Sequence, residues 1–185
     1  AERMRPQRLD EYIGQDHLLG ADGPLAKSLQ AGFLPSLILW GPPGVGKTTL
    51  ARLLAQAVNK QLHTLSAISS GVKDVRDIIE RVEQNGMFKG NGTVLFIDEI
   101  HRMSRPAEEL LYLAMEDFRV DVIVGKGAGA TSIPLELPHF TLVGATTRAG
   151  LLPSPLRDRF GFTAQLDFYS DLELAQIIKR SAELI

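Results

Sequence analysis

The stretch GPPGVGKTT, residues 41–49, decides the fold of this chain. It follows the apolar run 36–40 and precedes a helical pattern, and a phosphate-binding loop requires both flanks. The glycines let the backbone curl so that successive N–H groups face phosphate oxygens, while the start of the helix adds the positive end of its dipole. The stretch therefore predicts a nucleotide-binding loop and not an ordinary glycine-rich turn.

Two side chains of this loop have distinct expected roles. Lys47 supplies a positive charge for the β- and γ-phosphates, and the Thr48 hydroxyl is placed to bind Mg²⁺. The expected ligands are ATP or ADP together with Mg²⁺. We expect the nucleotide to contact the whole loop, namely Gly41, Pro42, Pro43, Gly44, Val45, Gly46, Lys47, Thr48 and Thr49.

Composition narrows the class of protein. The chain has 185 residues, 44% of them apolar, which suits one domain with a substantial core, and the absence of cysteine excludes disulfides and thiolate chemistry. Twenty Lys and Arg against 22 Asp and Glu give a net charge of −2, so contact with DNA needs a local patch or parts outside this chain. No apolar run of about 18 residues supports a membrane span, and the polar start AERMRP predicts a cytoplasmic protein.

Short apolar runs alternate with amphipathic helical patterns along the chain. This alternation predicts an α/β fold of three layers around a mainly parallel, five-stranded sheet. The expected strands are 36–40, 61–65, 94–97, 140–147 and 162–168. The expected helices are 24–31, one directly after the loop, 72–86 with a turn at 90–92, one from its N-cap Ser104 towards Phe118, and one after a capping box of Ser170 and Glu173.

Two carboxylates follow the expected strand 94–97. Ligands in open α/β sheets sit at the carboxyl ends of the strands, so Asp98 and Glu99 are delivered towards the phosphate loop. We assign Asp98 to the Mg²⁺ shell and Glu99 to orienting or deprotonating the attacking water, because phosphoryl transfer depends on positioning. An Asp-Glu pair alone would indicate only a solvated strand end; its place after a buried strand and a phosphate loop favours the functional interpretation.

An expected β-hairpin lies between the Asp-Glu strand and the next core strand. Residues 120–124 and 131–137 flank the glycine-rich tip 125–129. Apolar residues on such an excursion need something to cover them, so the hairpin, about 119–137, is a candidate arm for a partner. An idle insertion is the alternative.

Polar residues after the strand 140–147 could complete the site. Thr147 can hydrogen-bond the attacking water or the γ-phosphate. Arg157 and Arg159 are either surface charge or an arginine finger, which stabilises the charge on the transferring phosphoryl group. The four histidines show no metal-ligand spacing and are expected to be surface or satisfied core groups: His17, His63, His101 and His139.

Taken in order, the motifs GPPGVGKTT, LFIDEIHR, GATTRAGLL and PLRDRFG resemble those of the AAA+ ATPases. From about residue 104 onward, the chain is similar to the RuvB family of Holliday-junction branch-migration motors. The first 104 residues or so, with RMRPQRLDEYIGQDHLLG and ISSGVKDVRDIIERV, look closer to the RarA (MgsA) family of replication-associated recombination ATPases. The two resemblances suggest a hybrid, either engineered or a divergent natural member, with its seam between Asp98 and Glu109.

The resemblance implies roles for further residues. AAA+ proteins assemble as hexameric rings with ATP between subunits, so Arg159, which matches the RuvB finger position better than Arg157, would act on the neighbour's nucleotide. Thr147 matches the family's sensor 1, and Tyr12 and Ile13 match a stretch near the adenine. The hairpin 120–137 corresponds to the RuvB element that contacts RuvA.

The resemblance also implies a helical lid and a carboxyl-terminal DNA-binding domain, which we expect to be absent from this chain. The expectation is therefore a weak ATPase core, mostly monomeric, with little DNA affinity. Two functions stay open: a DNA-repair motor module that hydrolyses ATP, and a nucleotide-binding switch or scaffold with little hydrolysis.

Overall fold

The computed structural model describes residues 2–89 and 92–185 and contains the predicted parallel sheet. Its strands are β1 (Leu37–Trp40), β2 (Gln61–Ser66), β3 (Thr93–Asp98), β6 (Phe140–Thr146) and β7 (Phe162–Gln165). They lie in the order β2-β3-β6-β1-β7, and every neighbouring pair is parallel. The predicted fold class is confirmed.

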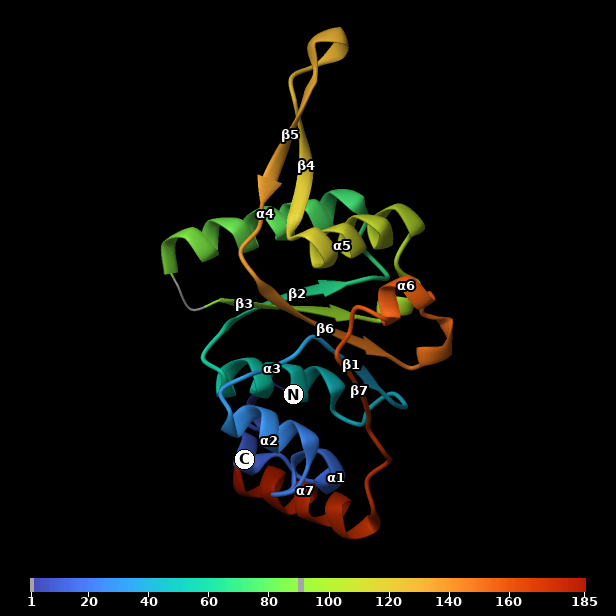
Figure 1. Ribbon diagram of the computed structural model, residues 1–185. Coiled ribbons are helices and arrows are strands. Elements are labelled where there is room, and N and C mark those ends of the chain that lie inside the picture. Colours follow the sequence, from blue (N-terminus) through green and yellow to red (C-terminus); the bar gives the residue numbers. More distant parts are fainter. Residues whose placement is uncertain (1, 90–91) are drawn as a thin grey trace.

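Helices cover both faces of this sheet (Figure 1). One face carries α4 (Val72–Lys89) and α5 (Arg105–Asp117), and the other carries α2 (Pro24–Gln30) and α3 (Lys47–Ala57). Side chains alternate accordingly along β3: Leu95 and Ile97 join the cluster on the α4 and α5 side, while Val94 and Phe96 join the cluster beneath α2 and α3. Burial on both faces explains why this strand reads as an unbroken apolar run.

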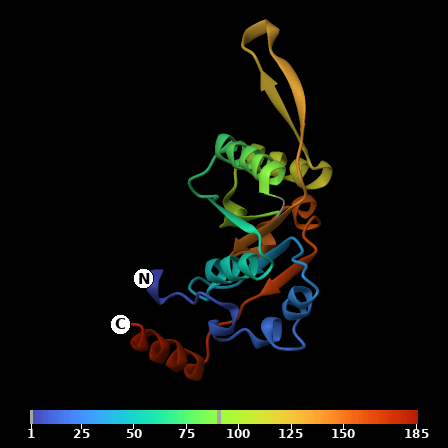
Figure 2. The same cartoon turned by 90° about the vertical axis from the view of Figure 1, so that its left-hand side faces the viewer.

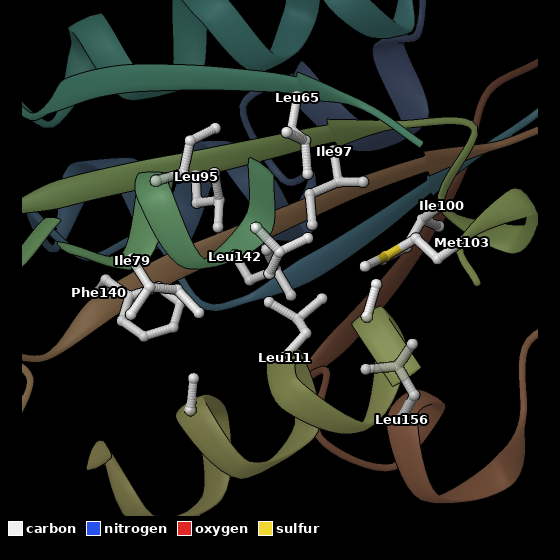
Figure 3. Close-up of a cluster of buried hydrophobic side chains, with 14 of the residues drawn as sticks. Leu65, Ile79, Leu95, Ile97, Ile100, Met103, Leu111, Phe140, Leu142 and Leu156 are labelled. Carbon is white, nitrogen blue, oxygen red and sulfur yellow. The ribbon is translucent and has the colours of Figure 1, made fainter. Parts of the chain in front are cut away.

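The cluster on the α4 and α5 side holds the turn after β3 in place (Figure 3). Ile100 is fully buried there, at the start of a 3₁₀ turn (Ile100–Arg102). A Cβ at Gly144 of β6 would lie 3.0 Å from Cδ1 of Ile100, so only glycine leaves this side chain its full space. This packing fixes the backbone at the carboxyl end of β3 relative to β6.

The hairpin consists of β4 (Arg119–Val124) and β5 (Thr131–Glu136), joined through a 3₁₀ turn at Gly127–Gly129. It projects away from the rest of the molecule in both views (Figures 1 and 2). Its base is packed, because Val120 and Leu137 are buried. Towards the tip, apolar side chains are exposed: Ile123, Val124 and Ile133.

Helix α7 (Asp171–Glu183) lies beside the amino-terminal segment (Figure 2). Arg180 on this helix donates to a carboxylate oxygen of Glu11 at 2.6 Å and to the Met4 carbonyl at 2.9 Å. The remaining short elements are α1 (Asp16–Leu19), α6 (Ser154–Arg157) and the 3₁₀ turns Glu2–Met4, Leu9–Glu11 and Ala149–Leu151. In the described ranges, no helix is both long and apolar enough to cross a membrane.

Two predicted elements end three residues away from the expected positions. Helix α4 continues through Gly86 to Lys89, because one helical glycine costs only about 1 kcal/mol. The strand expected at 162–168 ends at Gln165, because the Gln15 amide takes both backbone hydrogen bonds of Asp167, at 2.8 and 3.0 Å. Ser104 occupies the N-cap position of α5 without a side-chain cap, whereas the capping box of Ser170 and Glu173 is present. The predicted turn at 90–92 lies mostly outside the described residues.

Candidate nucleotide site

The loop of residues 41–46 joins β1 to α3 at the carboxyl edge of the sheet. Gly44 and Gly46 have positive φ angles of 81° and 91°, a region that other residues seldom adopt. A Cβ at Gly46 would also lie 2.8 and 2.9 Å from the hydroxyls of Tyr12 and Tyr169. The loop shape therefore depends on glycine at these positions.

Lys47 is folded into this loop. Its side chain is buried, and Nζ donates to the carbonyls of Gly41 at 2.8 Å and Pro42 at 2.7 Å. Burial lowers the pKa of this ammonium, while the nearby carboxylates of Glu99 and Asp98 act in the opposite direction. Among the described residues, the hydrogen-bond partners of this charge are neutral carbonyls, which hold it at the centre of the loop.

A cavity of about 380 Å³ joins the loop to the end of β3. Asp98 and Glu99 line it together with Lys47, and Asp98 Oδ1 accepts a hydrogen bond from the Glu99 backbone N–H at 3.1 Å. Its other lining residues are Arg5, Pro43, Gly44, Gly46, Thr48 and Thr49. A hydroxyl from Thr48 and a carboxylate from Asp98 are oxygen ligands of the kind that Mg²⁺ prefers, so the residues present fit this ion.

A second cavity, of about 280 Å³, lies between the loop, the amino-terminal segment and α7. Tyr12 and Ile13 line it, as do Gly44, Gly46 and Thr49 of the loop. Both tyrosines donate to one loop carbonyl, that of Val45: Tyr12 at 3.3 Å and Tyr169 at 3.0 Å. Burial raises the pKa of both phenols, which keeps them protonated as donors.

Among the lining residues that the sequence analysis missed are Arg5, Tyr169 and Arg180. No local pattern marks them, since each reaches the loop through the tertiary fold. The two cavities share Arg5, Gly44, Gly46 and Thr49, so one elongated ligand could occupy both.

The end of β6 carries a hydrogen-bonded group behind the carboxylates. Thr146 is fully buried; its Oγ1 accepts from the Arg148 backbone N–H at 2.9 Å and lies 2.7 Å from Nδ1 of His101. Nε2 of His101 lies 3.5 Å from Oε2 of Glu99. Thr147 follows directly and is half-buried. Although expected to be an ordinary surface or core histidine, His101 lies beside a candidate catalytic group.

Arg159 lies apart from both cavities. It lines neither of them, and its guanidinium donates to the Tyr112 hydroxyl at 3.1 Å and to the Glu116 carboxylate. The Arg159 guanidinium carbon also lies 5.1 Å from the centre of the Tyr112 ring, a cation–π contact. Arg157 donates to the Ser154 hydroxyl at 3.3 Å. The structure thus brings together the loop and the two carboxylates, but places the Arg159 side chain against α5.

A parallel sheet of this strand order, with a glycine loop after β1 and an Asp-Glu pair after β3, defines a nucleotide-binding core of the P-loop NTPase class. The family described as "Holliday junction DNA helicase RuvB P-loop domain" matches residues 4–166. The chain belongs to this family.

Similar proteins agree with this assignment. The RuvB subunit of the Holliday junction branch migration complex from Pseudarthrobacter chlorophenolicus is 52% identical over 98% of this chain, and that from Nocardioides sp. is 55% identical over 98%. The chain spans about half the length of these curated relatives, 49% in both cases. The solved structure of the Thermotoga maritima RuvB branch migration motor superposes with a TM-score of 0.78 at 42% identity, covering 98% of this chain and 55% of that one.

The family match also bears on the two halves of the chain. It runs without division across the seam expected between Asp98 and Glu109. The likeness to RuvB, expected from about residue 104 onward, therefore extends into the first hundred residues.

Proposed function

We propose that this chain is the ATP-binding and ATP-hydrolysing core of a Holliday-junction branch-migration motor of the RuvB type. The observation that carries the proposal is the convergence of Lys47, Asp98 and Glu99 around one cavity at the carboxyl edge of the sheet. Membership of the RuvB P-loop family supports the same conclusion.

The two cavities divide the nucleotide between them. The adenine fits the cavity lined by Tyr12, Ile13 and Tyr169, while the phosphates fit the one lined by Lys47. Loop N–H groups and the Lys47 ammonium then meet the phosphate oxygens.

Carboxylates and hydroxyls at the strand ends and at the start of α3 provide the chemistry. Thr48 and Asp98 would hold Mg²⁺, which when bound neutralises charge on the phosphate oxygens. Glu99 orients or deprotonates the attacking water, and Thr147 hydrogen-bonds this water or the γ-phosphate.

The arginine finger comes from a neighbouring subunit. Arg159 lines neither cavity of its own subunit, which supports a role at the next subunit's nucleotide in a ring. The bonds to Glu116 and Tyr112 hold it on its own subunit until a neighbour arrives.

Further partners follow from the same proposal. The exposed apolar residues of the hairpin 120–137 suit a RuvA-like partner. With a net charge of −2, DNA contact falls to parts of the motor outside these residues, and a DNA-processing role implies the cytoplasm. A hybrid origin with RarA-type fork processing remains a hypothesis that rests on the first hundred residues alone.

A nucleotide-binding switch or scaffold is the second candidate. The contact of Arg159 with its own α5 favours it, because a subunit in this state offers no finger to a neighbour.

ATPase rate per subunit, measured against protein concentration, separates the two functions. The motor core should give a rate that rises with concentration, and Arg159→Ala should lower it by about a thousandfold. Mixing Arg159→Ala with Lys47→Ala subunits should restore part of the rate, since each variant supplies what the other lacks. A flat, low rate with intact nucleotide binding supports the switch.

A further inference from the structure

His101 occupies a nearly enclosed position between two strand ends. Its side chain is 7% exposed, and the neighbouring Glu99 side chain is 24% exposed. Glu99 lines the phosphate cavity but His101 does not. Any effect of the imidazole on the reaction must therefore pass through the groups that it contacts, Glu99 on one side and Thr146 on the other.

The hydrogen bonds of Thr146 bear on which ring nitrogen of His101 carries the proton. One lone pair of Oγ1 accepts the backbone N–H of Arg148, a group that can only donate. The hydroxyl proton is then free to point at Nδ1 of His101, 2.7 Å away.

The contact on the other side of the ring also favours a proton on Nε2 and a bare Nδ1. Nε2 faces a carboxylate oxygen of Glu99 at 3.5 Å. A bare nitrogen lone pair facing a carboxylate would be repelled, whereas an N–H is attracted. Of the two neutral tautomers, the one with its proton on Nε2 satisfies both contacts: Nδ1 accepts from Thr146, and Nε2–H faces Glu99.

The backbone explains why such a support is needed. Glu99 is one of the non-glycine residues with positive φ, at 53°, and such a conformation costs about 1–2 kcal/mol. Its turn is held by buried Ile100, which packs against Gly144 of β6. Backbone packing therefore fixes the position of the Glu99 Cα atom. The direction of the carboxylate depends on a further side-chain contact.

We propose that His101 is a positioning residue that holds the Glu99 carboxylate through Nε2–H and ties it, through Nδ1, to Thr146 at the end of β6. The inference rests on the proposed function for the role of Glu99. Thr146 sets the tautomer of the ring through Nδ1, and the Nε2–H contact orients the Glu99 carboxylate.

Two substitutions separate the two contacts. Asparagine places its amide near the position of Nδ1 and keeps the link to Thr146, whereas glutamine reaches the position of Nε2 and can still donate to Glu99. We expect His101→Asn to lower kcat by about tenfold or more with ATP affinity changed less than about twofold, and His101→Gln to retain most of the activity. Equal losses in both variants, or losses that follow a lower melting temperature, would indicate a merely structural residue and overturn the proposal.

A double substitution tests whether His101 acts through Glu99. If it does, His101→Asn leaves the residual rate of Glu99→Gln unchanged; if the two losses multiply, the proposal is wrong. Glu99→Gln alone serves as the check on the proposed function, because a wild-type rate that does not depend on Glu99 would overturn that function instead.

The tautomer offers a readout that needs no hydrolysis. Ring ¹⁵N spectra of the nucleotide-free chain, with the His101 signals identified by their loss in His101→Asn, should show the proton on Nε2. Thr146→Val should change the Nδ1 signal of this ring. A proton on Nδ1 of the neutral ring would contradict the arrangement whatever the ATPase result.

Discussion

The nucleotide edge of the sheet and the β4–β5 hairpin distribute polarity in opposite ways. At the edge, polar groups are buried: Lys47 is 8% exposed and Thr146 is fully buried. On the hairpin, large apolar side chains face outward: Ile123 is 63% exposed and Ile133 is 49% exposed. Both regions reverse the usual arrangement, in which polar groups are exposed and apolar groups are buried. The buried polar groups of the edge suit phosphate oxygens, and the exposed apolar groups of the hairpin suit an apolar partner surface.

Glycine substitutions give the largest expected difference between these regions. Gly46 and Gly127 both have positive φ, 91° and 69°, but only a Cβ at Gly46 meets other atoms within 4 Å. We expect Gly46→Ala to lower the free energy of unfolding by about 2–4 kcal/mol, and Gly127→Ala by about 1–2 kcal/mol. Urea titration measures both values. Equal values would mean that the tyrosine hydroxyls move aside at little cost.

Lysine substitutions test the binding role of the edge. Lys47→Ala should weaken ADP binding by about 10- to 150-fold, because a charged hydrogen bond to phosphate is lost. Lys126→Ala, at the exposed hairpin tip, is the matched control and should leave the affinity unchanged. Titration with a fluorescent ADP analogue gives both constants, and a similar loss in both variants would contradict the assignment of the site.

Glu116→Gln tests whether the α5 contact restrains Arg159. The Arg159–Glu116 pair is partly exposed, at 36% and 35%, and such ion pairs have modest strength. If Arg159 serves the neighbouring subunit, the substitution should lower the protein concentration at half-maximal ATPase rate by about two- to fivefold. Glu109→Gln, nearer the start of α5 and paired with Arg105, should not shift that concentration. An upward shift would show that Glu116 presents the finger instead of restraining it.

The smallest effect is expected at the hairpin tip. Ile123→Asp should change the free energy of unfolding by less than about 0.5 kcal/mol, since its side chain is already in water. Val120→Asp, on the same strand but 5% exposed, should be strongly destabilising. Thermal melts of the two variants give the comparison, and a large loss for Ile123→Asp would mean that this side chain is covered in the free protein.

Local patterns predicted the phosphate loop, the Asp-Glu strand end and the hairpin, because each depends on neighbours in sequence. Residues that act through the tertiary fold escaped prediction. Tyr169 donates to Val45 across 124 positions, and Gln15 ends β7 by bonding Asp167 across 152 positions. His101 is part of the motif LFIDEIHR, but its proposed role depends on Thr146, which the fold of β6 places beside it.

The contact between Glu11 and Arg180 joins positions 169 residues apart, and both residues line the cavity proposed for the base. During synthesis from the amino terminus, β1 gains its sheet neighbours β6 and β7 only late, and this cavity has no far wall until α7 leaves the ribosome. A nascent chain therefore cannot hold the base until nearly all of it has emerged. Tight nucleotide binding then reports that nearly the whole of this chain has folded.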